Sequence, residues 1–249
     1  MAGAGLLRAE ASDTLLAPAK ADEITAPVLA EVRIEKANEV AMDPSIEVTR
    51  GPIPCPTGVR DGTKEEFAML NLAGVFPPIP TAFDENGNLA LDKYQENVRS
   101  LCAAGVDGIV FLGSNGEAVF LSEAEKLEVI RAGLEALPKG KLGLVGTGCE
   151  STRATIELSE QAAKLGAHAV MVIHPYYYKP LMTKQVLLEH YRAVAKASPA
   201  PVILYSMPRF TGFDLPVDVV AELSHEPNII GIKDSAGNVI QLHEIVSRS

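Results

Sequence analysis

The sequence predicts an α/β protein built on parallel strands, and three features of residues 71–249 support this prediction. Short apolar runs recur along this part of the chain, amphipathic helical segments separate them, and each strand–helix unit takes about thirty residues. The runs are almost continuously apolar, which is typical of strands that are covered on both faces. Parallel strands connected by helices account for all three features.

Six apolar runs are the predicted strands: Gly74–Ile79, Gly108–Leu112, Leu142–Val145, Ala169–Ile173, Val202–Tyr205 and Ile229–Ile232. The segments 104–110 and 165–171 also resemble each other and begin 61 residues apart, which corresponds to two strand–helix units. The sequence therefore predicts a regular alternation of strands and helices.

Local signals mark the ends of the predicted helices. Ser122 and Glu125 have the spacing of a capping box, which predicts a helix that begins directly after Ser122. Gly105 and Gly166 are expected to end helices two or three residues before the next strand, because glycine readily adopts the left-handed conformation that follows a helix.

Six consecutive strand–helix units indicate a (β/α)8 TIM barrel, for which about 250 residues are typical. Only sixteen residues follow Lys233, so we expect the barrel to be truncated after about six units, inside the sixth helix. An open, doubly wound sheet is the alternative fold, since it would be complete with six strands. Strand periodicity alone does not separate the two, so the chemistry of the strand ends has to decide.

Residues 1–70 differ in composition and are expected to form a mostly disordered extension, with residues 71–249 as the folded domain. The extension has six prolines, one aromatic residue, and twelve acidic against seven basic residues. The proline cluster at residues 50–56 is expected to exclude helix and strand, and a short helix is expected near residues 31–40. Early acidic residues make any targeting signal weak, so we expect a cytoplasmic or mitochondrial protein.

Composition argues against several classes of partner and cofactor. The net charge of −10, without a basic cluster, argues against nucleic acid binding, and no apolar run reaches the length of a membrane span. Three scattered cysteines and five histidines without paired spacing predict neither disulfides nor a metal site. A P-loop is missing, and Ser151 stands where a dinucleotide-binding motif needs its third glycine. We therefore expect no cofactor.

Lys233 is the most informative residue of the chain, because it lies at the end of the apolar run Ile229–Ile232. Burial disfavours a charged amine, and a neutral amine is the form that attacks a ketone to give a Schiff base. On this run alone, a lysine on an edge strand that reaches solvent is the alternative interpretation.

Other strand ends carry groups that suit the same chemistry. Residues Gly113–Glu117 predict a tight turn whose backbone amides bind a small carboxylate or an oxyanion, although a plain strand-to-helix turn has the same composition. Tyr205 ends the fifth strand. A tyrosine at this place relays protons if its hydroxyl points into a closed site. The alternative is a tyrosine at the edge of the site, with its ring packed on apolar residues and its hydroxyl in solvent. His174 is expected to pack or to hydrogen-bond near the end of the fourth strand.

Taken together, these motifs resemble the dihydrodipicolinate synthase/N-acetylneuraminate lyase family of class I aldolases. The matching segments are Gly113-Ser114-Asn115-Gly116-Glu117, Pro175-Tyr176-Tyr177, Tyr205-Ser206-Met207-Pro208 with Thr211-Gly212, and Gly231-Ile232-Lys233-Asp234-Ser235. Tyr205 and Lys233 are 28 residues apart, as in that family. The resemblance runs from about Gly74 to the end of the chain, roughly two-thirds of the family's barrel, and implies a lyase that acts on pyruvate through a lysine Schiff base.

The resemblance also implies roles for individual residues. Lys233 would form the imine with the keto carbon of pyruvate, and Tyr205 would shuttle protons. Tyr177 would be the tyrosine that family members present across a dimer interface, which implies a homo-oligomer, either a dimer or a homotetramer.

Three further residues are implied to bind substrate. Ser114 and Asn115 would hold the carboxylate of pyruvate and complete the proton relay, and Ser235 would orient substrate beside the lysine. The partner implied is a small 2-oxo acid, either pyruvate or a derivative of it.

Details of the motifs bear on the substrate. Dihydrodipicolinate synthases carry an arginine two residues after the proline of the tyrosine motif, where this chain has Phe210, with Arg209 one place earlier. If the segment is extended like a strand end, a shift of one residue turns the arginine side chain to the other face, away from the substrate. If the segment is instead a curled loop, it would still present Arg209 to the substrate.

The motifs look most like those of aldolases that cleave 4-hydroxy-2-oxoglutarate to pyruvate and glyoxylate. Aldolases of 2-keto-3-deoxy sugar acids share most of the pattern, and dihydrodipicolinate synthase is the other alternative.

The predicted truncation raises the possibility that the chain is not an active enzyme by itself. A barrel with open sheet edges is prone to aggregate, so the chain is alternatively a fragment, or a catalytically silent paralogue that pairs with a complete aldolase. The presence of both Lys233 and Tyr205 argues against the silent paralogue.

Overall fold

The computed structural model of the protein describes residues 53–55 and 68–249. Its main sheet has five parallel strands, which lie side by side in the order of the chain. These strands are β3 (Gly108–Phe111), β4 (Leu142–Gly146), β5 (Ala169–Ile173), β6 (Val202–Ser206) and β7 (Ile229–Asp234). Five of the six predicted strands are therefore confirmed to within one or two residues.

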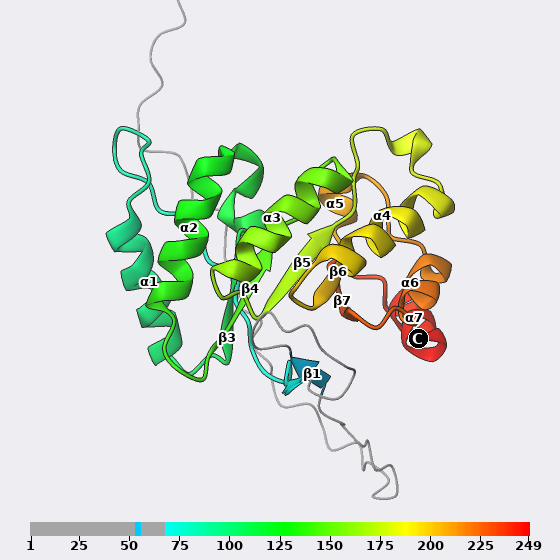
Figure 1. The fold of residues 1–249 in the computed structure, drawn as a ribbon, viewed down its shortest axis with the longest axis horizontal. Helices are drawn as coiled ribbons and strands as arrows, with labels where there is room; N and C mark the ends of the chain where they lie inside the picture. Colours follow the sequence, from blue (N-terminus) through cyan, green and yellow to red (C-terminus); the bar gives the residue numbers. More distant parts are fainter. Residues whose placement is uncertain (1–52, 56–67) are drawn as a thin grey trace, which may run out of the picture. The chain divides into compact units, whose positions relative to one another are not determined.

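Helices connect the strands and form one layer, in which each contacts the next along the chain. The long helices are α1 (Leu91–Ala103), α2 (Glu123–Ala136), α3 (Thr152–Lys164), α4 (Lys184–Ala197), α6 (Val217–Leu223) and α7 (Val239–Arg248). Figure 1 shows this succession from α1 to α7. No helix of residues 68–249 is both long and apolar enough to cross a membrane.

The order of the strands distinguishes the two folds that the sequence left open. A doubly wound sheet reverses its strand order at a switch point and places helices on both faces. Here the order β3-β4-β5-β6-β7 does not reverse, and consecutive helices contact one another in a single layer. This arrangement is that of a TIM barrel, as predicted.

The two faces of the sheet pack differently because successive side chains of a strand point to opposite faces. One face packs against the helices, through Ile109, Phe111, Val145, Val170, Val172, Val202 and Leu204. The opposite face carries a separate apolar cluster, made by Val110, Leu144, Ala169, Met171, Ile203 and Tyr205. Both faces of the central strands are thus buried, which explains their continuously apolar sequences.

The prediction of a strand at Gly74–Ile79 is wrong, because this segment does not form a regular strand. Only Pro78 bridges to Val110, in parallel, outside the named strands. The backbone N–H of Val110 donates to the Pro77 carbonyl at 3.0 Å, and the N–H of Ile79 donates to the Val110 carbonyl at 3.1 Å. Two successive prolines lack the N–H groups that would extend this pairing. The segment runs along β3 without completing a sixth strand.

The predicted helix ends are confirmed. Ser122 caps α2, with its Oγ accepting from the N–H of Glu125 at 3.3 Å while the Glu125 carboxylate accepts from the N–H of Ser122 at 2.8 Å. Gly105 and Gly166 follow α1 and α3 with φ of 97° and 100°. These values lie in the region that glycine adopts without steric cost, so each helix ends where the sequence indicates.

Part of the N-terminal prediction needs correction. Residues Ile53–Cys55 form a short strand, β1, that pairs antiparallel with β2 (Ala68–Leu70), although we expected the proline cluster to exclude a strand. Pro54 is tolerated because both strands of a two-stranded ribbon are edge strands. The rest of the predicted extension, including the helix expected near residues 31–40, lies outside the described residues.

Two buried tyrosines provide a test of packing in this fold. Tyr94 of α1 is buried, and its hydroxyl has no hydrogen-bond partner within the described part of the chain. Tyr191 of α4 is also buried, but its hydroxyl donates to the Val172 carbonyl at 3.1 Å. A buried polar group without a partner costs stability, whereas a satisfied one contributes to it.

Phenylalanine at these two positions should therefore have opposite effects. We expect Tyr94→Phe to raise the free energy of unfolding by about 1 kcal/mol and Tyr191→Phe to lower it by about 1 kcal/mol. Urea denaturation of both variants beside the wild-type chain measures the difference. Equal effects of the two substitutions would contradict the assignment of the Tyr94 hydroxyl as unpaired.

Candidate functional site

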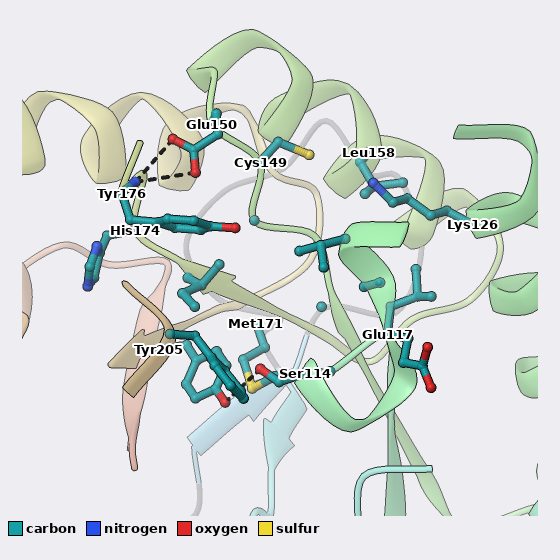
Figure 2. Close-up of a pocket in the computed structure, with 18 of the residues that line it drawn as sticks. Ser114, Glu117, Lys126, Cys149, Glu150, Leu158, Met171, His174, Tyr176 and Tyr205 are labelled. Carbon is teal, nitrogen blue, oxygen red and sulfur yellow. Dashed lines mark hydrogen bonds between the residues drawn. The ribbon is translucent and has the colours of Figure 1, made fainter. Parts of the chain in front are cut away.

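Three of the six predicted site residues meet at the carboxyl ends of the strands. Tyr205 on β6 and Lys233 on β7 are register partners, so their side chains lie on the same face of the sheet. The Lys233 Nζ lies 4.5 Å from the centroid of the Tyr205 ring. The Tyr205 hydroxyl is hydrogen-bonded to the Ser114 Oγ at 3.3 Å, a contact that Figure 2 shows at the lower edge of a cavity.

Lys233 is half-buried, whereas Tyr205 is only 4% exposed. Within the described sheet β7 pairs with β6 alone, so one side of Lys233 remains open. We expected an amine at the end of a buried strand, with a solvent-reaching lysine of an edge strand as the alternative. The structure places a half-buried amine over an aromatic ring on the last strand of the described sheet. The Lys233 amine thus lies over the face of the Tyr205 ring.

The turn that presents Ser114 differs from the prediction in its backbone. Leu112 and Glu117 flank the turn, and both have left-handed φ, 51° and 54°. The glycines inside the turn do not use this conformation, since Gly113 has φ of −73° and Gly116 is not among the residues with positive φ. A Cβ at Gly116 would lie 3.2 Å from the Ile79 carbonyl oxygen, so the backbone packs closely there and a larger residue would need a small shift. Left-handed non-glycine residues are costly and occur at functional sites.

The other three predicted site residues are not gathered around Lys233. Asn115 is exposed within the turn Ser114–Gly116. Ser235 is exposed, and its backbone N–H donates to the Ser206 carbonyl at 3.0 Å. Tyr177 is 74% exposed, with its ring 4.9 Å from that of Tyr178 in an edge-to-face contact. Their predicted roles remain predictions.

A cavity of about 500 Å³ opens beside the Tyr205–Ser114 pair (Figure 2). Its wall includes both of these residues, whereas Lys233 is not among the residues that line it. Figure 2 shows the Tyr176 ring pointing into this cavity below Cys149. Sequence reasoning assigned no role to several of its polar lining residues, which are Glu117, Lys126, Cys149, Glu150 and Tyr176. Two of them, Glu117 and Tyr176, lie within the segments that resemble the family, although the resemblance assigned neither a role.

The segment after Tyr205 is helical rather than strand-like. Residues Pro208–Thr211 form the short helix α5. Adjacent side chains of a helix differ by about 100° in direction, so the alternation expected for a strand does not apply here. Phe210 lines the cavity, whereas Arg209 is exposed and does not line it.

Two histidines are buried in this part of the structure, and one of them, His174, lines the cavity. His174 is completely buried near the end of β5. Its Nδ1 donates to the Pro175 carbonyl at 3.1 Å, and the centroid of its ring lies 4.3 Å from that of the Phe213 ring. His174 therefore packs and hydrogen-bonds at this strand end, as predicted. His190 of α4 is buried and hydrogen-bonded through Nδ1 to the Thr152 Oγ1 at 2.9 Å. Burial lowers the pKa of both rings, and the neighbouring His174 contributes to lowering the pKa of His190 to about 4.

The low pKa of His190 predicts a loss of stability in acid. Between pH values of about 6.5 and about 4, the unfolded chain binds a proton at this position that the folded chain does not bind. As the pH is lowered from about 6.5 to about 4, the free energy of unfolding should therefore decrease, by about 3 kcal/mol for this residue.

Urea denaturation at several pH values tests this expectation. His190→Gln should flatten the decline between pH values of about 6.5 and about 4, whereas the same change at the exposed His225 should leave it unaltered. An unchanged decline in His190→Gln would rule out His190 as its source.

Comparison with known proteins places this arrangement in a family. The model of the Dihydrodipicolinate synthetase family matches residues 71–249. A 4-hydroxy-tetrahydrodipicolinate synthase of Haloarcula marismortui is 36% identical over 183 residues, which are 74% of this chain and 59% of the relative. A probable mitochondrial 4-hydroxy-2-oxoglutarate aldolase of Emericella nidulans is 42% identical over 181 residues, which are 71% of this chain and 59% of that protein.

Solved structures agree with the sequence match. The crystal structure of a chloride-inhibited dihydrodipicolinate synthase from Acinetobacter baumannii, in complex with pyruvate, superposes with a TM-score of 0.68 at 36% identity. The match covers 71% of this chain and 60% of that one, so this chain spans about three-fifths of the length of the proteins it resembles. With a family match over residues 71–249 and the fold in agreement, the chain belongs to the dihydrodipicolinate synthetase family.

Proposed function

We propose that the protein is a pyruvate-dependent class I aldolase that acts through a Schiff base on Lys233. The observation that carries this proposal is the Lys233 amine, held over the Tyr205 ring, whose hydroxyl is in turn hydrogen-bonded to Ser114. A nucleophilic amine and a hydroxyl relay at the ends of neighbouring strands are the groups that imine chemistry requires.

The proposed reaction proceeds in steps that balance. The neutral Lys233 amine adds to the keto carbon of a 2-oxo acid, and loss of water leaves a protonated imine. The imine accepts the electron pair of the breaking C3–C4 bond while the C4 hydroxyl loses its proton, which releases an aldehyde and leaves an enamine. Protonation of the enamine at C3 and addition of water then release pyruvate and regenerate the amine.

Tyr205 moves the protons in this scheme. Imine formation requires a proton on the departing hydroxyl, and cleavage requires a base for the substrate's C4 hydroxyl. The Tyr205 hydroxyl contacts Ser114 at 3.3 Å, which supports a relay between these two groups. We assign Tyr177, presented to a second subunit of a homo-oligomer, as a further member of the relay.

Ser114, Asn115 and Ser235 are proposed to bind the substrate. Ser114 and Asn115 occupy the turn after β3, and Ser235 follows β7 two residues beyond Lys233. All three lie at the carboxyl ends of parallel strands, where barrels of this kind place their active sites.

The proposed substrate is 4-hydroxy-2-oxoglutarate, which would be cleaved to pyruvate and glyoxylate. The Emericella relative, 42% identical, bears the name of an aldolase for this compound, and it is described as mitochondrial. Phe210 stands two residues after Pro208, where dihydrodipicolinate synthases carry an arginine, which supports an aldolase over a dihydrodipicolinate synthase. Aldolases of 2-keto-3-deoxy sugar acids and dihydrodipicolinate synthase are the alternatives, the latter represented by relatives at 36% to 40% identity.

Three parallel assays separate these functions. The chain is given 4-hydroxy-2-oxoglutarate, 2-keto-3-deoxygluconate, or pyruvate with aspartate semialdehyde, and the release or consumption of pyruvate is followed. We expect the largest kcat/KM for 4-hydroxy-2-oxoglutarate. A larger value for either of the other two would replace the proposed substrate but keep the Schiff base.

A further inference from the structure

The loop after β5 is held by a carboxylate from a different strand–helix unit. The Glu150 Oε2 accepts hydrogen bonds from the backbone N–H of Tyr176 at 3.1 Å and from the N–H of Tyr177 at 2.9 Å. Figure 2 shows the carboxylate beside the Tyr176 backbone. A carboxylate that accepts from two successive amides makes charge-assisted hydrogen bonds, which are stronger than neutral ones.

Glu150 is itself fixed by the residues on either side of it. The Thr155 Oγ1 accepts from the N–H of Cys149 at 3.0 Å. Ser151 is the N-cap of α3, with its Oγ accepting from the N–H of Ala154 at 3.1 Å. The backbone on both sides of Glu150 is thus tied to the first turn of α3, which places the exposed Glu150 side chain beside the neighbouring loop.

The two tyrosines that Glu150 holds have different surroundings. The ring of Tyr176 lines the cavity, whereas Tyr177 is 74% exposed and contacts Tyr178. Tyr177 lies in a turn that begins directly after Tyr176, so the direction of its side chain depends on the conformation of the backbone at this point. Pro175 before them restricts one end of the segment, and Glu150 binds the two amides that follow.

We propose that Glu150 is a positioning residue, which holds the Tyr176–Tyr177 backbone so that Tyr177 projects toward the catalytic site of a second subunit. This inference rests on the proposed function, in which Tyr177 takes part in the proton relay. Glu150 does not touch the reacting atoms; it acts through the direction of the Tyr177 side chain. Misplacing a reacting group by about 1 Å costs up to about a hundredfold in rate.

The positioning itself can be measured without any activity. In Glu150→Ala, amide hydrogen exchange at Tyr176 and Tyr177 should become about tenfold faster, as expected when a hydrogen bond to a charged acceptor is lost. Glu150→Gln retains a side-chain oxygen acceptor and should stay within about threefold of the wild-type rates. The exposed Glu157 of α3 provides the control, since Glu157→Ala removes the same group from an exposed position in the helix that follows Glu150. Unchanged exchange in Glu150→Ala would overturn the proposal.

A double-mutant cycle tests the link to catalysis. Glu150→Ala should lower kcat between about ten- and a hundredfold with little change in KM, and in a Tyr177→Phe background it should lower kcat by no more than about threefold. Equal effects in both backgrounds would mean that Glu150 does not act through Tyr177. If the wild-type chain lacks turnover while Glu150→Ala still accelerates exchange, the proposed function fails and the positioning by Glu150 stands.

Discussion

Lys233→Met should abolish cleavage of 4-hydroxy-2-oxoglutarate, with a loss in kcat/KM of at least about 10,000-fold, because removal of a covalent nucleophile is among the largest single losses that enzymes show. Methionine has a similar length and no charge, and Lys233 is only half-buried, so the fold should be retained. The thioether forms no imine, and the reaction then has no electron sink for the C3–C4 bond. Pyruvate release in a coupled assay measures the effect.

The matched control is Lys164→Met, which makes the same chemical change at an exposed position in the last turn of α3. This variant should keep wild-type kcat/KM. Residual activity of Lys233→Met within about tenfold of the wild-type value would contradict a role as covalent nucleophile.

Tyr205→Phe should lower kcat between about 100- and 10,000-fold, the range for loss of a general acid or base. The substitution keeps the ring that lies under the Lys233 amine and removes only the hydroxyl that contacts Ser114. The imine should therefore still form, but more slowly, and its later steps should lack a proton donor. Single-turnover measurements with pyruvate and with the full substrate separate these two stages.

Tyr178→Phe is the control for this change, because it removes an exposed hydroxyl from a tyrosine near the same end of the sheet. It should leave kcat within about twofold of the wild-type value. If Tyr205→Phe is as active as Tyr178→Phe, the proton relay does not pass through Tyr205.

Most of the sheet could be predicted from the sequence, because a strand that is buried on both faces consists almost entirely of apolar residues. The alternation of Val170, Met171 and Val172 between the helix-facing cluster and the opposite cluster explains why no polar residue interrupts that strand. The same logic failed at Gly74–Ile79, since apolar side chains there are combined with Pro77 and Pro78, which lack backbone donors. Of this segment only Ile79 is buried, whereas Val75 is 63% exposed, so composition predicted neither the burial of the whole segment nor its hydrogen bonding.

The candidate site could be predicted only where neighbouring strands present it. Tyr205 and Lys233 meet because parallel pairing places them in register, and Ser114 follows the strand that begins the sheet. The left-handed conformations of Leu112 and Glu117 leave no trace in residue type, since neither is glycine. The contact of Glu150 with the Tyr176 and Tyr177 amides joins residues 26 and 27 positions apart, and no periodicity encodes such a distance.

Trapping of the Schiff base is the most direct test of the central claim. The purified chain is incubated with pyruvate and reduced with borohydride, and the modified peptide is located by mass spectrometry. We predict a single pyruvate adduct on Lys233 in the wild-type chain and none at this position in Lys233→Met. A chain that is folded by circular dichroism but forms no adduct, or forms it on another lysine, would contradict the assignment of Lys233 as the Schiff-base residue.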